Sequence, residues 1–169
     1  MGVSKDFKTL NPLEILDILP HRYPFLFVDR VDGVEVSKTS PIGDRIWGTK
    51  AVSYGESFFQ GHFPDRPVMP GVLSIEAISQ MASFLIWRHI QYSNETDLFY
   101  LASVDKAKFR QPIEPGVLLK IEVVLKNVKQ HKFWSVEGKI FSKKSHQSEE
   151  ELVAEASVTA VVMKKGKNK

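Results

Sequence analysis

The most informative stretch of this sequence is GHFPDRPVMPGVLSIEAISQ, which covers Gly61–Gln80. It places His62 in a loop with three prolines, and each proline fixes its own backbone φ angle. From Gly71 to about Ile90, apolar residues occupy nearly every direction around a helical axis, which is typical of a buried helix. A histidine in a rigid loop and one carboxyl group, Glu76, on an apolar helix are the two parts that a proton-transfer enzyme needs.

Three residues of this stretch are candidates for acid–base chemistry, and each also has a structural alternative. His62 can accept a proton near neutral pH or can hydrogen-bond a nearby carbonyl. Glu76 is costly to bury alone, so it either donates a proton from a raised pKa or bonds a neighbour such as Gln80, one turn later. Gly71 begins the helix, where backbone N–H groups can bind a developing enolate oxygen, or it only lets the chain turn. Sequence spacing does not place His62 opposite Glu76 of its own chain.

The remaining pattern predicts an α+β fold with an antiparallel sheet. Asn11, Pro12 and Glu14 form the start of a short helix that Pro20 ends. Several long antiparallel strands that follow one buried helix imply a sheet wrapped round that helix. Alternating and β-branched segments indicate strands at 25–36, with a bulge at Asp32-Gly33, and at 45–53, 98–110, 117–128, 132–141 and 152–163.

Residues 1–163 are expected to form a single domain, followed by a basic, disordered tail at 164–169. The polar segment 143–151 is expected to be a mobile hairpin loop. A chain of 169 residues is long enough to bury one core. The N-terminal residues hold no long apolar run, so a signal peptide is not expected.

Composition excludes several kinds of chemistry. The chain has no cysteine, which rules out disulfides and thiolate sites and fits a cytoplasmic location. The net charge of +3 is mild, and no basic face or recognition motif for nucleic acid is present. No histidines lie at metal-ligand spacing, and neither a phosphate loop nor a G-x-S-x-G serine elbow occurs. The pattern therefore favours acid–base chemistry without a metal or cofactor.

The chain resembles the Z type of (3R)-hydroxyacyl-acyl-carrier-protein dehydratase of bacterial type II fatty acid synthesis. The resemblance rests on three motifs in family order: LPHRYPFLFVDRV at Leu19–Val31, the stretch at Gly61–Gln80, and FYLASVDKAKFRQPIEPG at Phe99–Gly116. A glutamate at position 76 fits the Z type, whereas the A type carries aspartate there. The resemblance implies a hot dog fold, a homodimer that assembles to a hexamer, and active sites shared between two subunits.

The implied reaction removes water from a (3R)-3-hydroxyacyl thioester and gives the trans-2-enoyl thioester. By resemblance, His62 takes the proton from C2, Glu76 protonates the departing hydroxyl directly or through water, and the Gly71 N–H polarises the thioester carbonyl. A hot dog thioesterase and a non-catalytic acyl-binding module are the alternatives. The thioesterase would hydrolyse the thioester by attack of water on the carbonyl carbon, and the binding module would leave the substrate unchanged.

An acyl tunnel and a docking surface for acyl carrier protein are also implied. The docking surface is expected at Lys106, Lys108 and Arg110, which alternate on one strand face and could equally be a solvated face. The tunnel is expected to be lined by Phe63, Phe84, Tyr100 and Pro112, while Val68 and Met69 are better explained as core residues.

Overall fold

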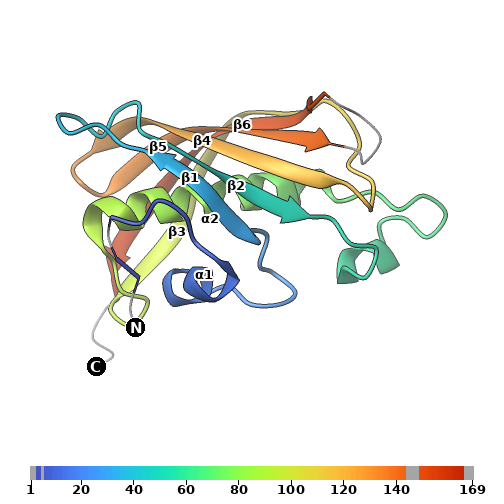
Figure 1. The fold of residues 1–169 in the computed structure, drawn as a ribbon, viewed down its shortest axis with the longest axis horizontal. Helices are drawn as coiled ribbons and strands as arrows, with labels where there is room; N and C mark the ends of the chain where they lie inside the picture. The colour runs from blue at the N-terminus through green and yellow to red at the C-terminus, as the bar shows by residue number, and fades with distance from the viewer. Residues whose placement is uncertain (1–2, 5, 144–148, 166–169) are drawn as a thin grey trace.

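The computed structural model describes residues 3–4, 6–143 and 149–165. Its strands form one six-stranded sheet in the order β1-β2-β4-β5-β6-β3, and every neighbouring pair is antiparallel (Figure 1). The long helix α2 (Gly71–Ile90) lies against one face of this sheet. A hot dog fold with an antiparallel sheet wrapped round a long buried helix is therefore confirmed. The strands are β1 (Arg30–Glu35), β2 (Arg45–Ala51), β3 (Asp97–Phe109), β4 (Leu118–Lys129), β5 (Phe133–Lys143) and β6 (Glu151–Lys164).

Helix α2 has the bounds that the sequence predicted, and its side chains form the centre of the core. Two strand glycines let it approach the sheet closely. A Cβ atom at Gly138 of β5 would lie 2.3 Å from Cγ2 of Ile78, and one at Gly48 of β2 would lie 2.6 Å from Cε of Met81. A larger residue at Gly138 would press on Ile78 of the helix, whereas one at Gly48 would also meet the Arg30 carbonyl oxygen of β1, 2.1 Å from its Cβ atom.

The N-terminal region agrees with the sequence at the helix but differs at the first strand. Helix α1 (Pro12–Ile18) has the predicted capping box between Asn11 and Glu14. The predicted bulge also occurs, as a register shift between Val31 and Gly33. Strand β1 begins five residues later than expected, because the side chain of Gln80 binds the preceding segment. Its amide accepts from the Phe27 N–H and donates to the Phe25 carbonyl, each at 2.8 Å.

The C-terminal strand extends past the expected end of the domain. Lys164 belongs to β6, and its Nζ lies 2.8 Å from Oδ1 of Asp97. The Lys165 N–H donates to the Thr96 carbonyl at 2.8 Å. The first two residues of the predicted tail are thus bonded to the fold, while residues 166–169 lie outside the described residues. Most of the predicted mobile loop, residues 144–148, also lies outside them.

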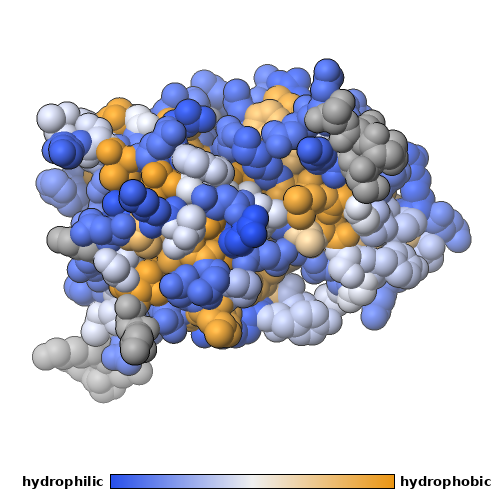
Figure 2. Space-filling view, in the orientation of Figure 1, coloured by the Kyte–Doolittle hydropathy of each residue, from blue (hydrophilic) through white to orange (hydrophobic). Residues whose placement is uncertain are grey.

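Figure 2 shows one face of the molecule, which is largely hydrophilic with apolar patches. Exposed apolar residues include Leu13 on α1 and Ile42 in the connection between β1 and β2. Among the described residues, no helix combines the length and the apolar character that a membrane span requires.

Strand β2 buries a lysine, because Lys50 occupies an inward position between apolar neighbours. Its Nζ lies 2.6 Å from Oε1 of Glu56 and 5.7 Å from the centre of the Phe27 ring. The Lys50 side chain is only 3% exposed and that of Glu56 is 15% exposed. This ion pair is largely buried, so the removal of either side chain would leave the other charge buried without a partner.

We expect Glu56→Ala to lower the free energy of unfolding by about 3 kcal/mol, because the buried ammonium group loses its carboxylate. Urea denaturation measures the change. The double variant Lys50→Met/Glu56→Ala should recover most of the loss. Glu137→Ala is the control, because Glu137 pairs with Lys126 on the exposed surface at 3.0 Å. Equal losses for Glu56→Ala and Glu137→Ala would contradict the prediction.

Candidate active site

The loop after the short 3₁₀ helix η1 (Ser57–Gln60) and the first turn of α2 enclose a pocket of about 230 Å³. The end of β3 and the start of β6 close its other side. His62 and Gly71, two of the three predicted chemical residues, both line this pocket. The other lining residues are Val68, Met69, Ser74, Phe109, Arg110, Gln111, Pro112, Ile113, Val153 and Ala154.

His62 is held by hydrogen bonds on several sides. Its Nδ1 lies 2.7 Å from the Val68 carbonyl oxygen, and the Val68 N–H returns a bond to the His62 carbonyl at 3.0 Å. A carbonyl oxygen can only accept, so Nδ1 carries a hydrogen, and in the neutral ring the lone pair is then on Nε2. The Phe63 ring stacks on the imidazole with its centroid 4.0 Å away. In this tautomer of the neutral ring, Nε2 is the atom that can take up a proton.

Gly71 begins α2 at a point where no side chain caps the helix. Free backbone N–H groups at such an end favour a negatively charged oxygen. A Cβ atom at this position would lie 2.9 Å from the Phe109 ring. Glycine is therefore required because Phe109 packs directly against the backbone, and not only because the chain turns there.

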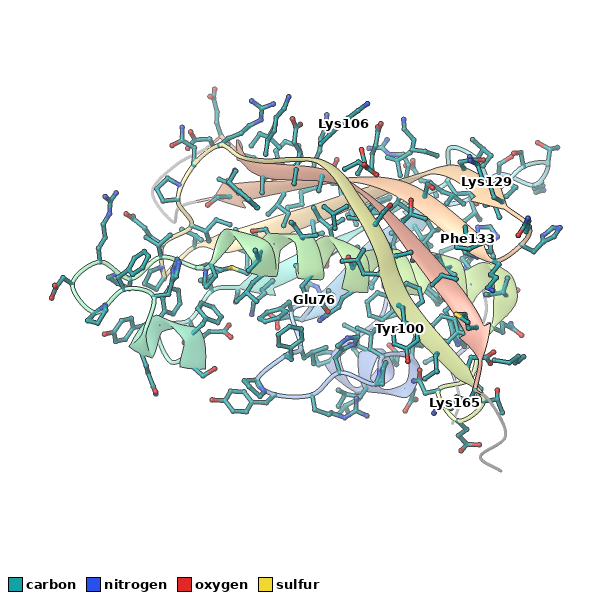
Figure 3. The ribbon with its side chains drawn as sticks, turned by 180° about the vertical axis from the view of Figure 1, so that it is seen from behind. Glu76, Tyr100, Lys106, Lys129, Phe133 and Lys165 are labelled. Carbon is teal, nitrogen blue, oxygen red and sulfur yellow. The ribbon has the colours of Figure 1, made fainter. Side chains whose placement is uncertain are left out.

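Glu76 lies elsewhere on α2, on the side toward the segment that follows α1 (Figure 3). Its Oε1 accepts from Nε2 of Gln80 at 2.8 Å, which confirms the predicted hydrogen bond one turn along the helix. The same Oε1 lies 3.4 Å from Nε2 of His21, and the carboxyl side chain is 21% exposed. Gln80 is itself fixed by Phe25 and Phe27, so the carboxyl group has a firmly held partner.

His21 is a neighbour of Glu76 that the sequence did not reveal. Burial lowers the pKa of His21 below its usual value; the Glu76 carboxylate opposes this shift, and Arg22 adds to it. His21 is therefore neutral at pH 7. It lies in the HRYP segment, far from Glu76 in sequence, and only the packing of that segment on α2 brings the two together.

Within one chain, the described contacts do not join His62 to Glu76. Glu76 is not among the residues that line the His62 pocket, and its described contacts are with His21 and Gln80. His62 lies in the pocket at the start of α2, and Glu76 lies beside His21 and Gln80.

The expected tunnel residues are spread over the subunit. Pro112 lines the pocket, and Phe63 stacks on His62 while 54% of its surface is exposed. Phe84 is fully buried in the core, and Tyr100 lies half exposed on β3 (Figure 3). Val68 and Met69, interpreted from sequence as core, both line the pocket, although Met69 also belongs to the core.

The expected docking residues gather near Glu155 of β6. Oε1 of Glu155 lies 2.6 Å from Nη2 of Arg110 and 3.7 Å from Nζ of Lys108. Arg110 in particular holds the pKa of Glu155 below its usual value. The expected strict alternation is broken, because a register shift separates Asp105 from Lys108 and Lys106 has a positive φ of 54°. Lys106 and Lys108 nevertheless line one groove on the sheet.

Among the described residues, no group of three or more histidine, aspartate or glutamate side chains is arranged to hold a metal ion. The arrangement consists instead of a fixed imidazole, an uncapped helix N-terminus and a separate carboxyl group. These parts can move protons and stabilise an oxyanion.

An antiparallel sheet wrapped round a buried helix defines a hot dog protein, and its candidate site lies beside the start of that helix. The chain belongs to the FabA-like domain family, whose model matches residues 19–157.

Curated relatives named 3-hydroxyacyl-acyl-carrier-protein dehydratase FabZ are similar over most of the chain. The protein from Rhizorhabdus wittichii is 41% identical over 158 residues, which cover 92% of each chain. The protein from Lactobacillus helveticus is 40% identical over 153 residues, covering 90% of this chain and 93% of the relative. The protein from Vibrio cholerae is 46% identical over 123 residues, covering 73% of this chain and 76% of the relative.

Solved structures with a similar fold are more distant in sequence. An uncharacterized protein from Erwinia carotovora subsp. atroseptica has a TM-score of 0.59 at 19% identity, covering 80% of this chain and 96% of that one. An acyl-CoA hydrolase mutant from Staphylococcus aureus has a TM-score of 0.54 at 18% identity, covering 69% of this chain and 63% of that one. Both support the fold alone.

Proposed function

We propose that this protein dehydrates (3R)-3-hydroxyacyl-acyl-carrier-protein to the trans-2-enoyl thioester during fatty acid elongation. The observation that carries the proposal is the hydrogen bond from Nδ1 of His62 to the Val68 carbonyl at 2.7 Å. It leaves Nε2 as a base in a pocket that also contains the start of α2. The FabZ relatives, which cover nearly the whole chain, support the same reaction.

In the proposed reaction, Nε2 of His62 takes a proton from C2, and the electron pair moves toward the thioester oxygen to give an enolate. The Gly71 N–H stabilises the charge on that oxygen. The C3–O bond then breaks, and the C2–C3 double bond forms. Glu76 supplies a proton to the departing hydroxyl, directly or through water, so that it leaves as water. No metal or cofactor takes part in these steps.

We further propose that the active unit is a homodimer, with Glu76 provided by the partner subunit, and that dimers assemble to a hexamer. The separation of Glu76 from the His62 pocket within one chain supports the shared site. Strand β3 lies at the edge of the sheet and exposes Tyr100, Leu101 and Val104, each at least 40% exposed. An exposed apolar edge strand is suited to pair with a second copy.

We expect Val104→Glu to shift the protein from dimer to monomer and to abolish turnover, because like charges would face each other between paired edge strands. Sedimentation velocity and the dehydratase assay measure both effects on one sample. Leu13→Glu is the matched control, because Leu13 is 75% exposed on α1 and belongs to no strand of the sheet. A monomeric Val104→Glu variant with normal turnover would contradict the shared site.

Acyl carrier protein is the proposed partner, since its acidic surface would complement Lys106, Lys108 and Arg110. Lys139 adds a further basic side chain to the groove that contains Lys106 and Lys108. Glu155 offsets part of this charge. We also propose that the protein is cytoplasmic, because it would encounter the carrier protein and its substrates there.

One incubation separates the proposed activity from its alternatives. The protein is mixed with a 3-hydroxyacyl-acyl-carrier-protein, and ultraviolet absorbance and free thiol are followed together. A dehydratase raises the absorbance of the conjugated enoyl thioester and releases no thiol. A thioesterase would release thiol, and a binding module would change neither signal. Either of the last two results would contradict the proposed function.

A further inference from the structure

Helix α2 buries three serines, and the hydroxyl of one of them is bonded differently from the other two. Oγ of Ser79 donates to the Ile75 carbonyl at 2.9 Å, and Oγ of Ser83 donates to the Ser79 carbonyl at 3.0 Å. Both satisfy the hydroxyl within the helix, one turn back. Ser74 is 1% exposed, and its buried Oγ has no hydrogen-bond partner in the described part of the chain.

A buried hydroxyl without a partner is unfavourable, so such a group is often reserved for a ligand or water. Ser74 lines the His62 pocket, together with Gly71. Residues three apart share one face of a helix, and helical side chains tilt toward the N-terminus. The Ser74 hydroxyl is therefore directed back toward the uncapped start of α2, where Gly71 presents its N–H.

We propose that the Ser74 hydroxyl is a second hydrogen-bond donor to the thioester oxygen of the substrate, beside the Gly71 N–H. The inference rests on the proposed function and extends it by adding a side-chain donor to the site. A carbonyl oxygen has two lone pairs and can accept from both donors. Negative charge grows on this oxygen when His62 removes the C2 proton, so donors placed beforehand lower the barrier.

The first test compares steady-state kinetics of the wild type with Ser74→Ala and Ser74→Cys on a 3-hydroxyacyl-pantetheine thioester. We expect kcat to fall about tenfold to a hundredfold in Ser74→Ala, with KM changed less than about threefold. Ser74→Cys should be almost as slow, because a thiol has a similar shape but is a weak donor. Ser79→Ala, on the same helix, is the control and should keep the normal rate. An unchanged kcat in Ser74→Ala would overturn the proposal.

Thermal unfolding separates a role in binding from a structural role. Ser74→Ala removes a hydroxyl without a partner, so its Tm should equal or exceed that of the wild type. Ser79→Ala loses a hydrogen bond and should not gain stability. A lower Tm in Ser74→Ala, in proportion to its loss of activity, would mark Ser74 as structural and overturn the proposal.

Calorimetric binding of a saturated acyl-pantetheine thioester tests the contact without turnover, since this probe has the thioester oxygen but no 3-hydroxyl. We expect Ser74→Ala to raise its Kd about twofold to threefold, in line with the small change expected in KM. If Ser74→Ala weakened the binding of the 3-hydroxyacyl thioester but not that of the saturated probe, Ser74 would contact the 3-hydroxyl group of the substrate. The assignment of Ser74 to the thioester oxygen would then be wrong. A wild type that binds the probe through Ser74 but produces no enoyl thioester would contradict the proposed function alone.

Discussion

His62→Ala is expected to lower kcat by about 100- to 10,000-fold, the usual contribution of a general base. Alanine removes Nε2, the atom that the bond from Nδ1 to the Val68 carbonyl leaves with a free lone pair. The variant should still form the dimer, because the exposed apolar residues of the β3 edge that are proposed to pair are unchanged. The measurements are initial rates of enoyl thioester formation and sedimentation velocity.

Two further variants separate proton transfer from the placement of the loop. His62→Asn keeps an amide N–H that can donate to the Val68 carbonyl, but it provides no base. We expect His62→Ala to lower the Tm, because the hydrogen bond to the Val68 carbonyl is lost. His62→Asn should recover part of that Tm and have an equally low kcat. His131→Ala, at the turn between β4 and β5, is the control for loss of a histidine elsewhere. A His62→Asn variant with near-normal turnover would show that His62 only holds the loop.

Local features of the fold could be predicted because short-range rules determine them. The capping box of Asn11 and Glu14, the bounds of α2, and the bulge at Gly33 each follow from residues close together in sequence. The late start of β1 could not be predicted, because it depends on Gln80, more than fifty residues away. Tertiary contacts overrode the strand propensity of the segment at Phe25–Phe27.

In the candidate site, too, features that depend on nearby residues could be predicted, and features that depend on distant contacts could not. His62, Gly71 and Glu76 could be predicted as site residues because each is unusual in its local setting. Ser74 gave no signal, since α2 also contains Ser79 and Ser83 and only the structure shows which hydroxyl lacks a partner. Two contacts in the site join segments that are distant in sequence, so neither could be inferred from a local pattern. They are the approach of His21 to Glu76 and the packing of Phe109 on Gly71.

Glu76→Gln is expected to lower kcat by about 100-fold or more, because an amide can accept from Gln80 but cannot transfer a proton to the departing hydroxyl. The amide keeps the size of the side chain, so the dimer and the bond to Nε2 of Gln80 should persist. Glu95→Gln, in the exposed segment before β3, is the control. Full activity of Glu76→Gln would contradict proton donation by this residue.

Co-expression of His62→Ala and Glu76→Gln subunits tests whether the two groups come from different chains. In a shared site, each mixed dimer contains one site with both changes and one site with neither, because a two-fold axis relates the two sites. Random pairing should then restore about a quarter of the wild-type sites, although each variant alone is nearly inactive. If His62 and Glu76 of the same chain acted together, every site would carry one change and no activity would return. In mixed dimers purified with two different tags, one site in two is intact, so a shared site should give about half of the wild-type rate. The recovered rate therefore decides which chain supplies the carboxyl group.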